Sequence, residues 1–201
     1  MAAMTIVAWE RADWAHGSAG ERRGFSIARR ERLTDGWRFH GSEVLIGEET
    51  LSCTFSVVVG DDWVTRRVEA SAVSAAGETR RVLEAAEGRW SVDCASRPDL
   101  DGCVDVDIAA TPLTNTFPIR RLAHLAVVEQ ATSGVAWVDV PALGVIRVDQ
   151  TYERLADRDG LARWRYSDPL HGAFVLTVDA EGLVVDYEGF ARRIPTSGRP
   201  G

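Results

Sequence analysis

The sequence predicts a mostly β fold: a strongly curved antiparallel meander, a half-barrel or β-roll, with one main helix packed on it. Two observations support this prediction. Runs of alternating apolar and polar residues recur along most of the chain, with short turn signals between them. Only one segment, which begins near Thr116, carries the start signals of a helix. Strands joined by short hairpins pair antiparallel, whereas parallel strands need a long crossover.

The strand-like runs fall into two groups on either side of the helix. Short turns such as Glu87–Gly88 and Asp179–Gly182 are typical of hairpins. In the first group the expected strands cover residues 53–59, 63–74, 79–86 and 89–94. In the second group they cover residues 135–140, 145–152, 161–166, 173–178 and 183–187. Successive hairpins of this kind indicate an antiparallel meander.

The helix is expected to run from Thr116 to Gly134. Residues 114–116 all favour an N-cap, and Pro118 suits the first turn because its missing N–H needs no partner there. Leu122 and Leu125 continue the helical spacing, and a glycine is a common helix end.

No linker separates the two groups of strands, so one domain over residues 1–201 is expected, with a core over about residues 24–193. Residues 1–22 have a less regular pattern. Residues 192–201 are expected to form a loose tail.

The charge balance excludes some partners. The net charge is −7, and a nucleic-acid-binding protein normally has a basic face, so no nucleic-acid partner is expected. All 23 basic residues are arginine, and alanine, glycine, valine and aspartate are abundant. This composition is typical of a GC-rich genome and indicates a bacterial source. It gives no information on the oligomeric state.

The cysteines and the N-terminus bear on the compartment. Cys53, Cys94 and Cys103 are odd in number and lack C-x-x-C spacing, which favours free thiols, although a Cys94–Cys103 bridge stays possible. Residues 1–10 lack a signal-peptide pattern, and no apolar run is long enough to span a membrane. We therefore expect a cytoplasmic protein.

Two aspartates form the first candidate site. If residues 103–108 form a strand, Asp105 and Asp107 share one face about 6.6 Å apart. Such a pair could perform acid–base chemistry. The alternative is a half-exposed strand with Val106 and Ile108 turned inward, and alternation alone favours it.

Two adjacent arginines form the second candidate site. Arg120 and Arg121 lie just inside the expected helix, where they could hold a phosphate or carboxylate head group. A structural ion pair with Asp105 or Asp107 is slightly favoured.

No other signal points to an enzyme or a metal site. The four histidines lack metal-ligand spacing, and the chain contains no G-x-S-x-G elbow, Walker loop or G-x-G-x-x-G run. No metal or cofactor is expected. Strand aromatics, which include Trp37, Phe39, Trp137 and Tyr166, could line an apolar pocket or fill an ordinary core, and composition alone favours the core.

One long motif resembles a known family. The run CVDVDIAATPLTNTFPIRRL at Cys103–Leu122 closely resembles the signature of the bacterial glycolipid-binding domain family, formerly a domain of unknown function. Further matches bring the resemblance to roughly residues 24–193. They lie at Gly41–Gly47, Gly60–Arg66, Ala136–Leu143, Gln150–Arg154 and Asp179–Tyr187. The sequence differs from the family at Phe55, Phe117 and Glu188, where Tyr, Leu and Pro are usual.

The resemblance implies a fold similar to lipoprotein lipid carriers, in which a curved antiparallel sheet encloses a hydrophobic cavity. A lipid or glycolipid is the expected ligand, with acyl chains among the strand aromatics and a head group near the strand-to-helix corner. The expected ligand-binding residues are Asn115, Arg120, Arg121, Asp105, Asp107, Trp137 and Tyr166.

A binding protein is favoured over an enzyme, but two alternatives stay open. One is a hydrolase of a sugar-containing or ester substrate that acts through Asp105 and Asp107. The other is a protein-interaction module with a filled core and no pocket.

Overall fold

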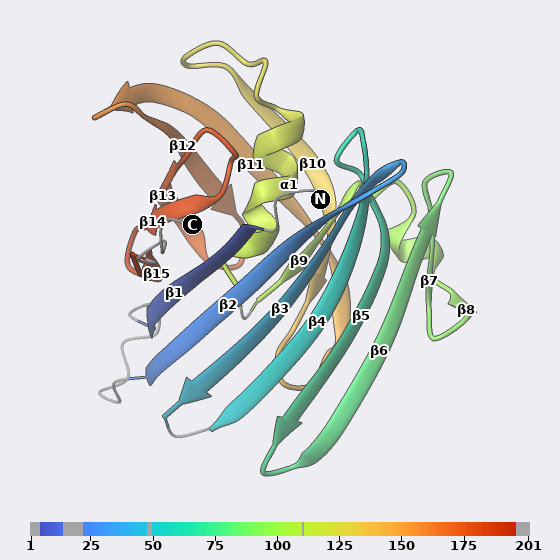
Figure 1. Cartoon of the computed structure of the whole chain (residues 1–201). Helices are drawn as coiled ribbons and strands as arrows, with labels where there is room; N and C mark the ends of the chain where they lie inside the picture. The colour runs from blue at the N-terminus through green and yellow to red at the C-terminus, as the bar shows by residue number, and fades with distance from the viewer. Residues whose placement is uncertain (1–4, 14–21, 48–49, 110, 196–201) are drawn as a thin grey trace.

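The computed structural model describes residues 5–13, 22–47, 50–109 and 111–195 (Figure 1). In these residues fifteen strands form one continuous sheet, in the order β8-β7-β6-β5-β4-β3-β2-β1-β15-β14-β13-β12-β11-β10-β9. Neighbouring strands pair antiparallel, except that β9 and β10 are parallel. The predicted curved meander with one helix is confirmed.

The strands form two groups, and β1, β2 and β3 extend the first group beyond the expected residues 53–94. The first group is β1 (Thr5–Asp13), β2 (Arg22–Leu33), β3 (Gly36–Ile46), β4 (Leu51–Gly60), β5 (Thr65–Ser74), β6 (Gly77–Ala86), β7 (Arg89–Val92) and β8 (Ala95–Ser96). The second group is β9 (Asp105–Ile108), β10 (Gln130–Val138), β11 (Val145–Arg158), β12 (Leu161–Asp168), β13 (Gly172–Val178), β14 (Val184–Tyr187) and β15 (Ala191–Arg193). Short 3-10 turns cover Pro98–Leu100 and Leu113–Asn115, and α1 covers Thr116–Arg121.

The sheet curls until its last strand meets its first half. The backbone N–H of Thr65 at the start of β5 donates to the carbonyl oxygen of Val104 at 3.0 Å, and the N–H of Val106 donates to Thr65 Oγ1 at 3.0 Å. Strand β9 and helix α1 are therefore enclosed by the curve of the sheet, as Figure 1 shows. This arrangement brings the strand-to-helix corner into the interior.

The prediction of a helix from Thr116 to Gly134 was wrong in its length. Helix α1 ends at Arg121, and Gly134 lies inside β10. Beyond the helix, the N–H of Val128 donates to the carbonyl oxygen of Arg154 at 2.7 Å, and Val128 has a φ of 68°. Pairing with the neighbouring chain segment thus replaces the hydrogen bonds that a longer helix would have made.

The prediction for the chain ends was wrong for residues 5–13 and for Arg192 and Arg193. Residues 5–13 form β1, which lies in the middle of the sheet and pairs with both β2 and β15. Its Trp9 is fully buried, and Trp9 Nε1 donates to the carbonyl oxygen of Val184 at 2.8 Å. At the other end, Arg192 and Arg193 belong to β15 rather than to a tail. Residues 1–4, 14–21 and 196–201 lie outside the described residues.

Most strand aromatics of the first group fill the core. Phe39 packs on Phe117 of α1 with ring centroids 5.2 Å apart, and Trp37 stacks on Trp63 at 6.0 Å. These rings occupy the space between the sheet and the helix, together with buried Val57, Val59 and Leu83. For this half of the sheet the ordinary-core interpretation is confirmed.

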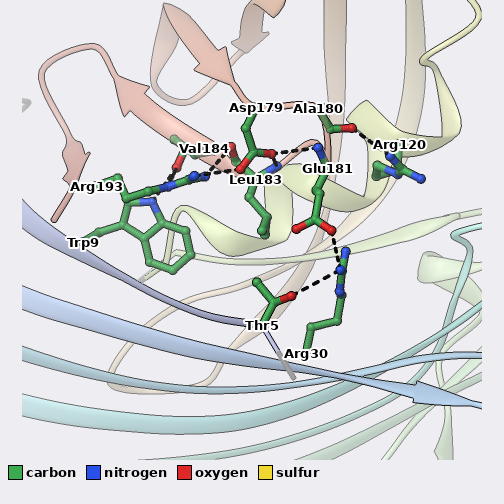
Figure 2. A network of polar contacts seen from close by, with 10 residues as sticks. All are labelled: Thr5, Trp9, Arg30, Arg120, Asp179, Ala180, Glu181, Leu183, Val184 and Arg193. Carbon is green, nitrogen blue, oxygen red and sulfur yellow. Dashed lines mark hydrogen bonds and ion pairs between the residues drawn. The ribbon is translucent and has the colours of Figure 1, made fainter. Parts of the chain in front are cut away.

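Figure 2 shows how the turn between β13 and β14 is held by three arginines from other elements. Arg193 of β15 donates to Asp179 Oδ2 at 2.7 Å, and Arg30 of β2 donates to Glu181 Oε1 at 2.6 Å. Arg120 of α1 donates to a backbone carbonyl oxygen of the same turn at 3.2 Å. One turn therefore joins the helix to both groups of strands.

Candidate functional site

A cavity of about 320 Å³ lies where the two groups of strands meet the corner between β9 and α1. Its polar lining consists of Arg11, Asp107, Thr111, Asn115, Asp139, Tyr166, His171 and Tyr187. Its apolar lining consists of Leu45, Ile108, Ala109, Trp137, Val140, Phe174 and Phe190, and Gly189 completes it. One cavity thus has both a hydrogen-bonding side and an aromatic side, as small-molecule sites commonly do.

The local sequence explains the corner beside the cavity. Proline cannot donate to a strand ladder, so Pro112 ends the β9 region, and Thr111 Oγ1 accepts the N–H of Leu113 at 3.2 Å. Asn115 precedes α1, but its side chain does not cap the helix. Asn115 Oδ1 instead accepts a hydrogen bond from the Tyr152 hydroxyl at 2.8 Å. The asparagine is therefore fixed by the second group of strands and lines the cavity.

Asp105 and Asp107 share one face of β9, but they have different surroundings. The expectation of a half-exposed face was wrong, because Asp105 is buried and Asp107 is only partly accessible. The Arg121 guanidinium donates to both oxygens of Asp105, with N–O distances of 2.5 and 2.6 Å. The structural ion pair is thus confirmed. It removes Asp105 from the cavity lining, so the two aspartates do not form an acid–base pair there.

Asp107 lies in the cavity lining and is held from both sides. Its Oδ1 accepts from Thr114 Oγ1 at 2.7 Å, and its Oδ2 accepts from Gln150 Nε2 at 2.7 Å. Burial raises the pKa of Asp107, although these two hydrogen bonds oppose the rise. The carboxyl is fixed in place at the polar side of the cavity.

A chain of hydrogen bonds continues from Asp107 to a histidine. Gln150 Nε2 also lies 3.0 Å from the Tyr166 hydroxyl, which donates to Asp168 Oδ2. His171 Nδ1 lies 3.1 Å from both oxygens of Asp168. Five side chains from β9, β11, β12 and the β12–β13 turn are therefore connected along one side of the cavity.

Asp168 carries the negative charge next to the histidine in this series of hydrogen bonds. Burial alone raises the pKa of Asp168, but hydrogen bonds from the Tyr166 hydroxyl and from the backbone N–H groups of His171 and Leu170 outweigh it. The pKa of Asp168 is therefore below its ordinary value. An ionised carboxylate consequently stands behind the imidazole of His171.

Arg120 and Arg121 do not line the cavity. Arg121 is bound to Asp105, and the Arg120 guanidinium lies 4.9 Å from the centre of the Trp63 ring. The expected set of ligand-binding residues is therefore divided. Asp107, Asn115, Trp137 and Tyr166 line the cavity, whereas Asp105, Arg120 and Arg121 hold the corner together.

Comparison with known proteins agrees with this architecture. The model of the family described as "Putative glycolipid-binding" matches residues 13–193. The chain belongs to this family. A solved DUF1089 family protein from Pseudomonas aeruginosa is 29% identical, with a TM-score of 0.70 over 90% of this chain and 95% of that chain. A β-barrel-like DUF1849 protein from Brucella abortus is 11% identical, with a TM-score of 0.56 over 94% of this chain and 93% of that one, and so shares the fold. No curated protein matches the chain.

Arg11 lines the cavity, although it was not among the expected ligand-binding residues. It lies on β1 with Trp9, and its guanidinium is 4.2 Å from the centre of the Phe190 ring. The signal was the alternation of Val7, Trp9 and Arg11, which shows that they share one face once residues 5–13 are recognised as a strand. The cation beside the cavity is thus Arg11 rather than Arg120 or Arg121.

Glu43 and His171 were also missed. Glu43 of β3 is buried and accepts from Ser26 Oγ at 2.5 Å, and burial raises its pKa to about 8 although Ser26 and Arg11 oppose the rise. His171 follows Asp168 by three residues in a hairpin turn, a spacing that carries no known motif. Neither the burial of Glu43 beside Ser26 nor the position of His171 in the cavity lining could be inferred without the strand pairings.

Three further findings concern the remaining predictions. The three cysteines are free thiols, with Cys53 and Cys103 buried and Cys94 exposed. No helix in the described ranges is long and apolar enough to cross a lipid bilayer. Those ranges also contain no group of three or more His, Cys, Asp or Glu side chains arranged to hold a metal ion.

Proposed function

We propose that the protein binds a lipid or glycolipid and places the polar head group in the cavity. The observation that supports this proposal is the two-sided lining, in which Asp107 and Asn115 face the same space as Trp137 and Phe174. Membership of a family described as "Putative glycolipid-binding" supports this ligand class.

The lining suits hydroxyl-rich head groups. Carboxylate and amide oxygens accept hydrogen bonds from hydroxyl groups, and aromatic rings such as Trp137 and Tyr187 pack against apolar faces. Arg11 adds a cation that could contact an anionic group. A sugar, with or without a phosphate, fits this combination.

The size of the cavity limits what it can enclose. A volume of about 320 Å³ lies near the lower end of the range of roughly 300–1,000 Å³ for ligand pockets. We infer that it holds a head group and the first part of one acyl chain rather than a whole two-chain lipid. The acyl chains were expected among the strand aromatics in general, and we now propose that they lie on the Trp137 side, because Phe39 and Trp63 are packed in the core.

The compartment and domain organisation belong to this proposal too. Free thiols at all three cysteines support a reducing compartment, such as a bacterial cytoplasm. The continuous sheet supports one domain. The cavity itself is at odds with a protein-interaction module that lacks a pocket.

Native mass spectrometry of gently purified protein tests the binding. The wild-type chain should carry a lipid or take up an added one, and Trp137→Ala should lose most of it because the ring forms part of the apolar side. Phe25→Ala is the control, since Phe25 is an exposed aromatic on β2 outside the cavity lining. Bare polypeptide in every spectrum, even after glycolipid and phospholipid are added, would rule the proposal out.

A further inference from the structure

His171 and Asp168 form a hydrogen-bonded pair beside the cavity that lipid binding does not require. The side chain of Asp168 is 1% exposed, whereas that of His171 is 31% exposed and lines the cavity. Because Nδ1 faces Asp168, Nε2 is the nitrogen left for the cavity. A carboxylate in this position holds the imidazole in the tautomer whose Nε2 is a base.

The surroundings fix this pair more firmly than a turn needs. Asp168 Oδ1 accepts the backbone N–H groups of Leu170 and His171 at 2.7 and 2.8 Å, which is sufficient to hold the hairpin turn. Asp168 Oδ2 accepts in addition from the buried hydroxyl of Tyr166, which Gln150 contacts in turn. The carboxylate therefore has a defined orientation toward the imidazole.

An aromatic side chain lies beside the imidazole. The Trp137 ring centre lies 5.6 Å from that of His171, at an interplanar angle of 42°. An indole beside the imidazole shields one of its sides from bulk water, and a shielded base acts more strongly on a bound substrate.

We propose that the cavity hydrolyses carboxylic esters, with His171 as the general base and Asp168 as its positioning residue. His171 Nε2 removes a proton from a water molecule, and the water oxygen forms a bond to the ester carbonyl carbon. The tetrahedral intermediate then breaks its bond to the alcohol oxygen, which takes the proton back from the imidazolium. The products are one carboxylic acid and one alcohol, and the imidazole returns neutral.

Two other carboxyl groups near the cavity are less suited to the role of base. Both oxygens of Asp107 already accept a hydrogen bond, from Thr114 and from Gln150, so Asp107 is less available than His171 to take a proton from water. The pKa of Asp107 is raised and that of Asp168 is lowered, and such a divergence within one site is typical of separated acid–base roles. Glu43 is buried outside the lining.

Turnover of p-nitrophenyl butyrate by the full chain tests the proposal. The wild-type protein should hydrolyse this ester, and His171→Asn should lower kcat by about 10²–10⁴-fold, the usual contribution of a general base. His124→Asn is the matched control, because His124 is an exposed histidine outside the cavity lining, with Nδ1 3.2 Å from the carbonyl oxygen of Arg121. A wild-type rate no greater than that of His171→Asn would overturn the proposal. Equal losses in the two histidine variants would overturn it too.

The Asp168→Asn variant adds a measurement that a purely structural role would not change. This variant should lower kcat for p-nitrophenyl butyrate and leave KM nearly unchanged, because the carboxylate orients the imidazole and does not contact the substrate. Unfolding of this variant, seen in its melting curve, would leave the wild-type and His171→Asn comparison to decide.

Ester hydrolysis uses the same cavity as the proposed binding but is measured independently of it. Wild-type protein that retains lipid and does not turn over the ester would remove the activity and leave the binding. Turnover of the ester without retention of lipid would remove the binding and leave the activity.

Discussion

At the scale of single residues, the Asp105–Arg121 pair shows how one ion pair determines what a neighbouring residue can do. Asp105 is buried, and both of its oxygens are bound by the guanidinium. A bidentate pair of this kind is fixed in geometry as well as in charge. Because Asp105 is paired with Arg121 outside the cavity lining, Asp107 is the β9 carboxylate that lines the cavity.

Replacing Arg121 with alanine should leave Asp105 buried without its partner. We expect the free energy of unfolding to fall by about 3–5 kcal/mol, the usual cost of breaking a buried ion pair from one side. Denaturant titration measures it. Arg80→Ala, which breaks an exposed pair with Glu78, is the control and should change the stability little. Similar losses in both variants would show that the buried pair is not a structural anchor.

At the scale of elements, the sequence predicted the strands better than the helix. Alternation predicted most of β4–β7 and β10–β14 because each of these strands has one face toward the core. The spacing of Leu122 and Leu125 also fits a helix, but this segment is instead bonded to β11 through Arg154. Local spacing could not reveal that competing partner. The T-P-x-T-N-T motif, in contrast, correctly placed the corner at which β9 ends and α1 begins.

The turn between β13 and β14 depends on a glycine at its end. Gly182 has a φ of +75°, and a Cβ at this position would lie 2.8 Å from Cδ of Arg120. Gly160, at the end of the β11–β12 turn, has a φ of +76°, and a Cβ there would meet no atom within 4 Å beyond its chain neighbours. The two glycines therefore share a backbone requirement and differ in their contacts.

Thermal melting of two alanine variants separates these effects. Gly160→Ala should cost about 1–2 kcal/mol for the left-handed backbone alone. Gly182→Ala should cost more, because Arg120 must also move away from the turn that it holds (Figure 2). Equal melting temperatures for the two variants would show that the Arg120 contact contributes nothing.

At the scale of the whole molecule, the cavity is a product of long-range pairing. Arg11, Asp107 and His171 come from three distant parts of the chain and meet because β1 lies in the middle of the sheet and β9 lies inside its curve. The sequence supplied Asp107, Asn115, Trp137 and Tyr166 as candidates, since they lie in recognisable strands or in the motif. It did not supply Arg11 or His171, because only the strand order brings them to the same space.

Buried Glu43 should make the stability of the whole protein depend on pH. Its pKa is raised from 4.5 to about 8, so between these values the folded state holds a proton that the unfolded chain has lost. The contribution is fully present below about pH 4.5 and is lost as the pH rises toward 8, at up to about 1.4 kcal/mol per pH unit.

Chemical denaturation between pH 5 and pH 8.5 measures this dependence. Glu43→Gln keeps an acceptor for Ser26 and removes the ionisation, so the stability of this variant should fall less with rising pH than that of the wild type. Glu69→Gln makes the same chemical change at an exposed position of β5 and should follow the wild-type curve. Parallel curves for wild type and Glu43→Gln would refute the prediction.

The position of β1 has a consequence for the order in which the protein can be made. Strand β1 is made before the other described strands, yet one of its two partners is β15, at residues 191–193. The first group of strands can pair among themselves during synthesis, but the β15-facing edge of β1 and the indole N–H of Trp9 lack their partners until the last strands emerge. An open strand edge beside uncovered apolar side chains is a template for aggregation. Ribosome-bound chains stalled before residue 184 should therefore be the species that most needs chaperone protection.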